Sequence, residues 1–335
     1  MIWTSTYPEV AVGGATLHGM VFDAIERHPD RIALVDGVSG ASVSYAELGR
    51  RVSRISAWLV ADGVRPGAAV AVWAPNTPPW VACALAATRI GAAVTGINPQ
   101  WTSDETAAQL ADAGVETVVT IPALVEKAAG MSGVKRIIVV GEGPRATRLS
   151  DVLAAESPIP PASLDERAVA LLPYSSGTTG LPKGVRLTHS NVVTSVRQVA
   201  AVTHISERDT VLALAPFFHV LGAVVMMAVP LAVGATVVTV PRFDPAQVLG
   251  VLERHGVTVI AVPPPVADFL ARHPAVAGRN LSSLELVAVG GAAFPEPVHR
   301  ELAARLPGCV IAQGWGLTET TGSVGLTCPW AGGVR

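Results

Sequence analysis

Short runs of apolar residues alternate along the chain with stretches that carry helix signals. In the first half, the runs at 69–74, 92–97, 115–120 and 136–140 are rich in Val, Ile and Ala and predict buried strands. A similar run lies at 258–262 in the second half. Because alternating strands and helices are typical of βαβ units, the pattern predicts mostly parallel sheets.

Capping residues mark the helix boundaries. Thr102 and Glu105 have the spacing of a capping box, and Gly114 stands where that helix would end. Asp244 can cap a second helix, and Gly256 lies just past its expected end. Each of these helices would lead directly into one of the predicted strands.

One stretch, 220–240, contains no charged residue and is long enough to cross a bilayer. Gly222, Pro230 and Gly234 interrupt it, and its second half is rich in β-branched residues. A helix followed by a buried strand explains this pattern better than a membrane span. We therefore expect no stable membrane insertion.

Composition favours a large folded core. Half of the 335 residues are apolar and only 15% are charged, below the usual quarter. We predict an α/β fold with two packed subdomains of the αβαβα type, one at 1–165 and one at 166–335. The connection between them would lie at 141–168, which is rich in Pro, Ser and charged residues.

Charge and cysteine content exclude several classes of protein. The net charge is −2 and no Lys/Arg cluster occurs, so we expect no nucleic-acid partner. Cys83, Cys309 and Cys328 are far apart in the sequence, which argues against a zinc site or a disulfide framework. The N-terminus lacks the pattern of a signal peptide, and we expect a cytoplasmic protein.

The most informative stretch is YSSGTTGLPKGV at 174–185. Its glycines let backbone N–H groups approach a ligand, its hydroxyls add donors, and Lys183 adds a charge suited to phosphate oxygens. The spacing is not that of a Walker loop, because Pro182 stands where that loop has glycine. The stretch therefore predicts a phosphate-binding loop of another kind.

Three further motifs follow in order: FFH at 217–219, GGAA at 290–293 and QGWGLTE at 313–319. Together with SSGTTGLPKGV, they resemble the signatures of the adenylate-forming (AMP-binding) enzymes, which include acyl- and aryl-CoA ligases, luciferases and peptide-synthetase adenylation domains. The resemblance runs along nearly the whole chain and is closest to the 4-coumarate–CoA ligase branch. It implies the large N-terminal domain of such an enzyme, in an incomplete form.

The resemblance implies a two-step reaction with ATP, Mg²⁺ and CoA. A carboxylate attacks the α-phosphorus of ATP to give acyl-AMP and pyrophosphate, and CoA then takes the acyl group. Thr178, Lys183 and Glu319 would be catalytic, and Glu319 would also hold Mg²⁺. The implied nucleotide-binding residues are Ser175, Ser176, Gly177, Thr178, Thr179, Gly180, Lys183, Gly291, Ala292, Gln313, Gly314, Trp315 and Thr318.

The resemblance also implies an acid pocket, formed by His219, Leu221, Gly222, Gly290, Ala292 and Gly316, and a contact between Arg242 and CoA. Amino-acid-activating relatives usually carry Asp in the pocket motif, which this chain lacks. Leu221 stands where coumarate ligases commonly have Tyr, which argues against hydroxycinnamate itself. We expect an aryl or medium-chain acyl acid as the partner.

The family's functional residues continue beyond the motifs found here. No TGD segment occurs, and no small C-terminal lid domain with its lysine. We therefore expect a truncated ligase that binds nucleotide and acid but is impaired in catalysis. The alternative is a non-catalytic nucleotide-binding fragment or one part of a split protein, and self-association as a homodimer stays open.

Two rival functions receive less support from the residues. The stretch from Arg136 to Ala146 loosely matches a dinucleotide fingerprint, but Pro144 and Arg145 disrupt the helix opening that such a site needs. A serine hydrolase is disfavoured because the G-x-S-x-G motif is absent.

Overall fold

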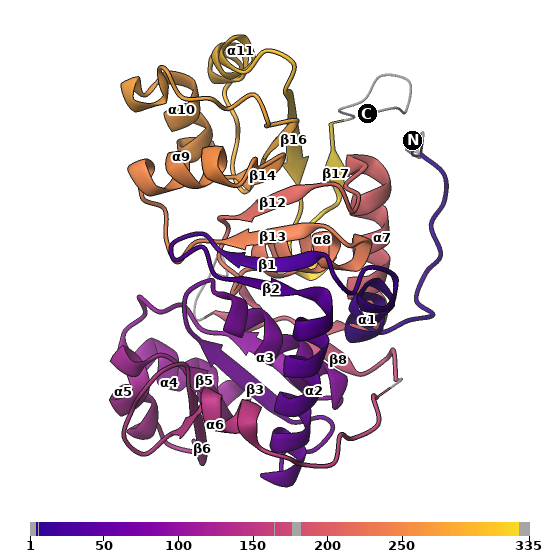
Figure 1. Cartoon of the computed structure of the whole chain (residues 1–335), viewed down its shortest axis with the longest axis vertical. Helices are drawn as coiled ribbons and strands as arrows, with labels where there is room; N and C mark the ends of the chain where they lie inside the picture. Colours follow the sequence, from indigo (N-terminus) through magenta and orange to yellow (C-terminus); the bar gives the residue numbers. More distant parts are fainter. Residues whose placement is uncertain (1–4, 6, 164, 176–181, 328–335) are drawn as a thin grey trace.

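The computed structural model describes residues 5, 7–163, 165–175 and 182–327. Two β-sheets with helices on their faces make up the molecule, one above the other in Figure 1. Nearly all neighbouring strands within the two sheets run parallel, and the exceptions are short strands at the sheet edges. This arrangement confirms the predicted α/β fold class with two packed layers of mostly parallel strands.

The seven-stranded sheet lies in the lower half of Figure 1 and has the strand order β11-β8-β4-β3-β5-β6-β7. Its strands are β3 (Ala69–Trp73), β4 (Ala93–Gly96), β5 (Val115–Thr120), β6 (Arg136–Val139), β7 (Thr147–Arg148), β8 (Val169–Leu171) and β11 (Leu187–Thr188). The helices α4 (Ser103–Asp112), η1 (Pro122–Leu124), α5 (Val125–Ala129) and α6 (Leu149–Ala154) belong to the same part of the chain.

The eight-stranded sheet lies in the upper half and has the order β17-β16-β15-β14-β12-β13-β1-β2. Its strands are β1 (Ile32–Asp36), β2 (Ser42–Ser44), β12 (Thr210–Ala213), β13 (Thr236–Thr239), β14 (Val259–Val262), β15 (Leu286–Val289), β16 (Val310–Trp315) and β17 (Gly325–Leu326). The helices α9 (Pro245–Arg254), α10 (Pro264–Arg272), η3 (Pro274–Val276), α11 (Glu296–Arg305) and η4 (Thr318–Thr320) lie along the same segment.

The remaining helices lie between the two sheets or beside them. They are α1 (Leu17–Arg27), α2 (Tyr45–Ala61), α3 (Pro78–Arg89), α7 (His189–Thr203), η2 (Leu221–Ala228) and α8 (Val229–Val233). A separate hairpin is formed by β9 (Tyr174–Ser175) and β10 (Lys183–Gly184).

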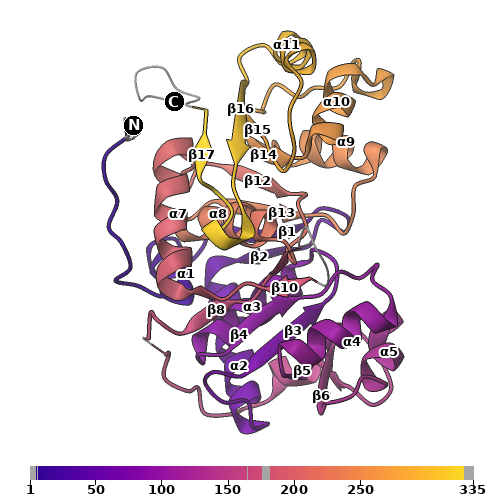
Figure 2. The same ribbon diagram turned by 180° about the vertical axis from the view of Figure 1, so that it is seen from behind.

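The apolar core follows this layering. The largest cluster combines buried residues of α1, α2, α3, α7 and η2 with residues of both sheets. A second cluster joins the eight-stranded sheet to α9, α10 and α11, and a third joins the seven-stranded sheet to α4 and α5. The molecule therefore has five layers, helices–sheet–helices–sheet–helices, as Figures 1 and 2 show.

The predicted elements appear where the pattern placed them. The apolar runs form β3, β4, β5, β6 and β14. Thr102 and Glu105 make the capping box of α4, and the Asp244 side chain caps α9 by accepting the backbone N–H of Gln247. Gly114 and Gly256 both have positive φ directly after these helices.

The strands of the two sheets interleave along the sequence. The early strands β1 and β2 join the upper sheet, where β1 pairs in parallel with β13. Conversely, β8 and β11 extend the lower sheet through the pairing of β8 with β4. Each sheet thus contains strands from both sides of residue 165, so a single cut there does not separate the two sheets.

The uncharged stretch 220–240 is a helix followed by a strand, as predicted. It comprises η2, which is a π-helix, then α8, a turn at Gly234 with φ +89°, and the buried strand β13. Across the described part of the chain, every helix is too short or too polar to cross a bilayer.

Candidate active site

The GGAA and QGWG motifs lie side by side at the ends of two adjacent strands. β15 and β16 are parallel, with Val289 opposite Gln313, so the residues that follow them meet at one edge of the upper sheet. A Cβ atom on Gly290 would lie 3.1 Å from the carbonyl oxygen of Gly314. Gly291 has φ +86°, which glycine adopts at little cost, and its neighbourhood is open.

The turn after β16 presents Thr318 and Glu319. The N–H of Leu317 donates to Thr320 Oγ1 at 3.0 Å, and the N–H of Gly322 donates to the carbonyl oxygen of Leu317 at 3.0 Å. A Cβ atom on Gly316 would lie 2.3 Å from the carbonyl oxygen of Gly322, so this turn closes only because Gly316 lacks a side chain. The result is a compact loop with the Glu319 carboxylate exposed.

The predicted nucleotide-facing side chains on this edge are exposed. Trp315 has 62% of its surface accessible, and Gln313 is also exposed. Among the described residues, the Glu319 carboxylate makes no hydrogen bond or ion pair. An exposed carboxylate is suited to Mg²⁺, because this ion commonly takes one or two carboxylates and completes its shell with phosphate oxygens and water.

Two of the predicted phosphate-loop residues lie in the β9–β10 hairpin. Ser175 pairs directly with Lys183 in antiparallel register, so these two residues lie opposite each other. The side chain of Lys183 is exposed. The other predicted loop residues lie outside the described residues, and their roles stay predictions: Ser176, Gly177, Thr178, Thr179 and Gly180.

Tyr174 fastens this hairpin to α4. Its hydroxyl donates a hydrogen bond to Asp112 Oδ2 at 2.5 Å, and its ring packs under Gly184. Burial of the phenol, followed by its hydrogen bond to the Asp112 carboxylate, raises the pKa of Tyr174. The tyrosine therefore stays protonated and continues to donate across the neutral pH range.

The FFH motif forms the link between β12 and η2. The N–H of His219 donates to the carbonyl oxygen of Pro216 at 3.0 Å, and the His219 ring lies 4.7 Å from the ring of Phe218. Although the side chain keeps an exposed surface, desolvation by its surroundings lowers the pKa of His219. At neutral pH the imidazole is therefore uncharged. It can position a ligand by hydrogen bonding without attracting a cation or an anion.

This motif adjoins the Thr318–Glu319 turn. A Cβ atom on Gly322 would meet the side chain of Val220 at 3.4 Å. Ser195 of α7 donates a hydrogen bond from its hydroxyl to the carbonyl oxygen of Thr321 at 3.3 Å and fastens the same turn from behind. The predicted acid-pocket motif and the predicted magnesium ligand thus belong to one contiguous region.

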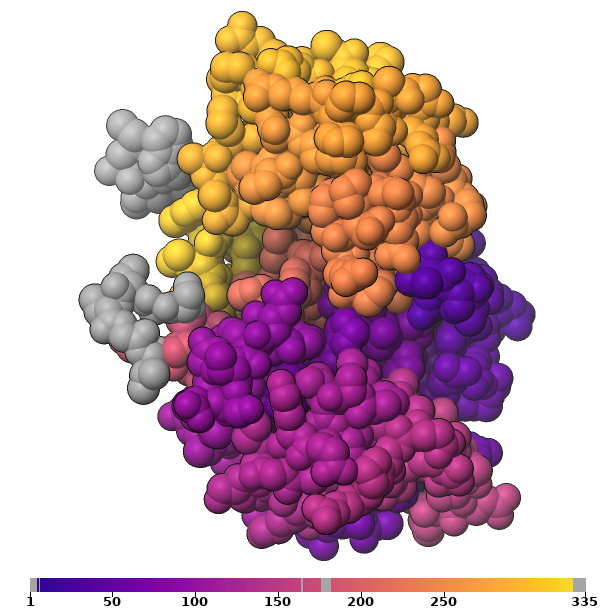
Figure 3. Space-filling view, turned by 90° about the vertical axis from the view of Figure 1, so that its left-hand side faces the viewer, coloured from indigo at the N-terminus to yellow at the C-terminus, as the bar shows by residue number. Residues whose placement is uncertain are grey.

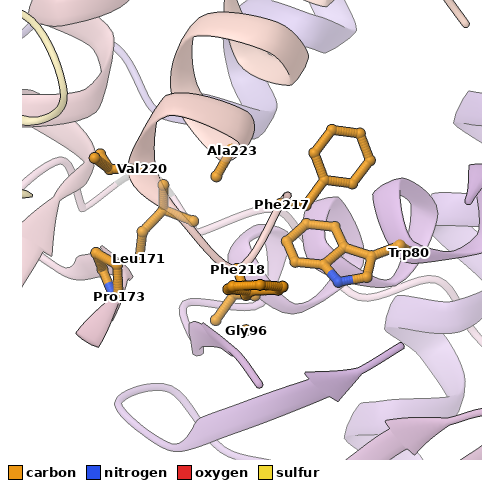
Figure 4. Close-up of a pocket in the computed structure, with 9 residues that line it drawn as sticks. Trp80, Gly96, Leu171, Pro173, Phe217, Phe218, Val220 and Ala223 are labelled. Atoms are coloured by element: carbon orange, nitrogen blue, oxygen red, sulfur yellow. The ribbon is translucent and has the colours of Figure 1, made fainter. Parts of the chain in front are cut away.

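A small apolar pocket opens beside the motif (Figure 4). Among its lining residues, Phe217, Phe218, Val220 and Ala223 come from the FFH segment and the start of η2. The others come from α3, from β4 and β8 of the lower sheet, and from the link between β8 and β9: Trp80, Val94, Gly96, Leu171 and Pro173. The predicted pocket residues His219, Leu221, Gly222, Gly290, Ala292 and Gly316 are not among these lining residues, and their contact with an acid stays a prediction.

Arg242 is exposed in the link between β13 and α9. Its neighbour Phe243 packs edge-to-face on Phe269 with 5.5 Å between the ring centroids. The dipeptide is thereby fixed to α10, while the Arg242 side chain remains accessible. This accessibility is compatible with a contact to a CoA nucleotide.

Contacts from the lower sheet were not predicted. Asn76, Trp80 and Gly96 all approach the FFH segment. The one available signal was the polar residue Asn76 immediately after a strand of apolar residues, since side chains at the carboxyl ends of parallel strands often serve a site. Trp80 and Gly96 carried no such signal.

Fold and site together define an α/β protein in which the carboxyl ends of β15 and β16, the Thr318–Glu319 turn and the FFH segment lie together. Figure 3 shows this side of the molecule, hollowed between the yellow and orange chain above and the purple chain below. Residues 21–334 match the AMP-binding enzyme family. The chain belongs to that family.

Known relatives agree with this assignment. The chain is 36% identical over 326 residues to 4-coumarate–CoA ligase 5 of Oryza sativa subsp. japonica, covering 95% of this chain and 60% of the ligase. The chain therefore spans about three-fifths of the length of that curated relative.

Two solved structures are similar in fold. The N-terminal domain of FACL13 from Mycobacterium tuberculosis superposes with a TM-score of 0.85 at 22% identity, covering 94% of this chain and 79% of that chain. The o-succinylbenzoate CoA synthetase MenE of Bacillus subtilis, solved with its acyl-adenylate intermediate, has a TM-score of 0.80 at 26% identity. It covers 92% of this chain and 60% of that chain. The predicted N-terminal-domain architecture of an adenylate-forming enzyme is confirmed.

Proposed function

We propose that the protein activates a carboxylic acid with ATP to form an acyl adenylate and then transfers the acyl group to CoA. The observation that carries this proposal is the convergence of three segments. The Thr318–Glu319 turn, the Gly290–Gly291 strand end and the FFH segment occupy one edge of the upper sheet. This edge offers a place for a nucleotide next to a place for an acid.

The nucleotide would lie along the ends of β15 and β16. The exposed ring of Trp315 provides a surface on which adenine can stack, and Gln313, Gly314, Gly291 and Ala292 border the base. Thr318 would donate to the α-phosphate from its hydroxyl. Glu319 would hold Mg²⁺, which when bound neutralises part of the phosphate charge.

In the first step, negative charge shifts onto the leaving group and no proton is transferred. A carboxylate oxygen of the acid attacks the α-phosphorus, and the bond from that phosphorus to the β-phosphate oxygen breaks to release pyrophosphate. Negative charge grows on the leaving group, so cationic and N–H donors near the β- and γ-phosphates stabilise the transition state. We assign this task to Lys183, whose side chain is exposed. In the second step the sulfur of CoA attacks the acyl carbonyl, and AMP leaves.

For the acid, we propose an aryl or medium-chain acyl compound. His219 is uncharged near neutral pH because desolvation lowers its pKa, and no carboxylate occurs between Phe217 and Gly222 to pair with an ammonium group. The relative at 36% identity is a 4-coumarate–CoA ligase, which supports an aromatic acid. Leu221 offers no phenol partner, so an acid without a para-hydroxyl group fits better.

For CoA, Arg242 is the proposed contact.

Calorimetric titration with ATP tests the nucleotide part of this proposal. We expect ATP to bind in the presence of Mg²⁺ and about tenfold more weakly in EDTA, because a charge-assisted contact contributes roughly 1.5–3 kcal/mol. The variant Glu319→Gln should lose the effect of Mg²⁺, whereas Glu26→Gln, at an exposed position on α1, should keep it. Equal affinity with and without Mg²⁺ in the wild-type protein would refute the role of Glu319.

A further inference from the structure

The FFH segment follows β12, a strand of the upper sheet, but packs on the lower sheet. It leaves the end of β12 and reaches η2 by passing over the carboxyl ends of β3 and β4. Asn76 stands directly beyond β3 and is 5% exposed. A polar side chain buried this deeply is stable only when it is hydrogen-bonded, so its partners decide its role.

Within the described part of the chain, the hydrogen-bond partners of Asn76 lie in the segment that leads to His219. Its Nδ2 donates to the carbonyl oxygen of Ala213 at 3.0 Å and to that of Ala215 at 2.9 Å. Its Oδ1 accepts the N–H of Phe217 at 2.8 Å. One amide side chain thus satisfies three backbone groups within five residues, and its two ends match the two carbonyls and the N–H in only one orientation.

Two further contacts hold the same segment against the lower layer. Trp80 of α3 packs on Phe217 with 5.1 Å between the ring centroids, and Figure 4 shows the two rings next to each other. Gly96, the last residue of β4, lies so close that a Cβ atom on it would be 2.5 Å from the Cα atom of Phe218. The segment is therefore fixed by packing on its two aromatic residues and by hydrogen bonds from Asn76.

We propose that Asn76 is a positioning residue for the acid site, which holds the 213–219 segment so that His219 and Val220 border the acid. This inference rests on the proposed function for the identity of the ligand. Asn76 follows a strand of the lower sheet and holds a motif that follows a strand of the upper sheet. The packing of the two sheets against each other therefore determines the shape of the pocket. Among the described residues of the ATP side, which include Lys183 and Glu319, none forms a hydrogen bond with Asn76.

Substitution of Asn76 leaves defined groups without partners. Asn76→Ala removes the side chain and exposes three buried backbone groups to an apolar environment. Asn76→Asp keeps the size but replaces the two N–H donors by an oxygen that faces two carbonyl oxygens. Both changes release the segment, and the second does so with the smaller change in packing.

Tyr45→Phe is a matched control. The Tyr45 hydroxyl is also buried and donates to the carbonyl oxygens of Ala235 at 2.7 Å and Leu231 at 3.3 Å, with no bond to the 213–219 segment. The substitution Tyr45→Phe removes interior hydrogen bonds of a similar kind away from the 213–219 segment. The comparison thus separates positioning from a general loss of stability.

Hydrogen exchange followed by mass spectrometry, together with titration, tests the proposal. In Asn76→Asp and Asn76→Ala, peptides covering 214–223 should exchange at least tenfold faster than in Tyr45→Phe, after correction for overall stability. Binding of benzoate, cinnamate or octanoate should weaken about tenfold, while ATP–Mg²⁺ affinity stays within twofold. Exchange equal to that of Tyr45→Phe, or equal weakening of acid and ATP, would overturn the proposal.

The two proposals fail in different ways. If the wild-type protein binds none of the three acids, the acid part of the proposed function is refuted. The exchange of peptides 214–223 then decides by itself whether Asn76 holds the segment. If Asn76→Ala does not fold, Asn76→Asp supplies both measurements.

Discussion

At Gly222 the backbone leaves no room for a side chain. The residue is the second of η2, shortly after the FFH motif, and a Cβ atom on it would lie 2.1 Å from the carbonyl oxygen of Pro216. Gly316 has the same relation to Gly322 in the turn that presents Glu319. Both glycines allow two stretches of backbone to approach closely next to the proposed ligand positions, so their identity is a condition for the geometry of the site.

We predict that Gly222→Ala destabilises the protein by about 3 kcal/mol, because the new methyl group meets backbone that cannot move aside cheaply. Thermal unfolding measures this as a lowered Tm. Gly325→Ala is the control. Gly325 has open space around its Cβ position and does not have a positive φ, so the Tm of this variant should change little. An unchanged Tm in Gly222→Ala would show that the segment is positioned differently.

For Lys183 we predict a selective effect on the triphosphate. Lys183→Ala should weaken ATP–Mg²⁺ binding about tenfold, since a charge-assisted bond contributes roughly 1.5–3 kcal/mol, and should leave AMP binding nearly unchanged. Calorimetry with the two nucleotides measures the difference, and Lys127→Ala, on the distant helix α5, serves as control. Equal weakening of ATP and AMP would exclude a role at the β- and γ-phosphates.

Among the elements, the apolar strands and the capped helices follow from local chemistry. The buried runs that form β3 and β5 have no competing pattern, and the caps of α4 and α9 use side chains at the helix start.

The sheet membership of β1 and β8 does not follow from the sequence. Their partners β13 and β4 are far away in the chain, and pairing with an open edge depends on the assembled sheet. The π-helical form of η2 likewise had no local signal.

The packing of α1 on α7 contains two buried histidines. The rings of His18 and His189 lie 5.4 Å apart, and the N–H of Leu17 donates to His189 Nδ1 at 3.0 Å. Burial, with the added repulsion of His189 and Arg89, lowers the pKa of His18 to about 3. Burial lowers the pKa of His189 to about 4, although the charge of Asp165 opposes this shift.

This pair predicts a loss of stability in acid. The unfolded chain takes up protons on both histidines below about pH 6.5, whereas the folded protein does not until about pH 4 for His189 and about pH 3 for His18. The free energy of unfolding should therefore fall between pH 6.5 and 4.5, by about 2 kcal/mol for each histidine. Urea unfolding at several pH values measures this slope.

His18→Gln should remove about half of that pH dependence, because the variant side chain does not titrate. Ser56→Ala is the control, since it removes a buried hydroxyl that donates to the carbonyl oxygen of Ala86 and adds no titrating group. It should lower stability equally at all pH values. A slope in His18→Gln equal to that of the wild-type protein would refute the contribution of His18.

At the scale of the whole molecule, the site contains motifs that can be recognised in the sequence and contacts that form only when the two sheets pack against each other. The motifs at 217–219, 290–293 and 313–319 pointed to one region, and the structure brings the described residues of these motifs to one edge. The contacts of Asn76 and Gly96 with this region could not be predicted, because they depend on how the lower sheet packs against the upper one. For the same reason, the small apolar pocket has a wall from each sheet.

The central claim is that nucleotide and acid bind next to each other on this edge. Binding of non-hydrolysable acyl sulfamoyl-adenosines measures it most directly, because such compounds join both ligands in one molecule. With benzoyl, cinnamoyl and octanoyl groups, we predict that at least one compound binds about a hundredfold more tightly than sulfamoyl-adenosine without an acyl group, since linked ligands gain from their effective concentration. The compound should also compete with ATP. If no acyl group improves binding over sulfamoyl-adenosine alone, the claim of an adjoining acid site is wrong.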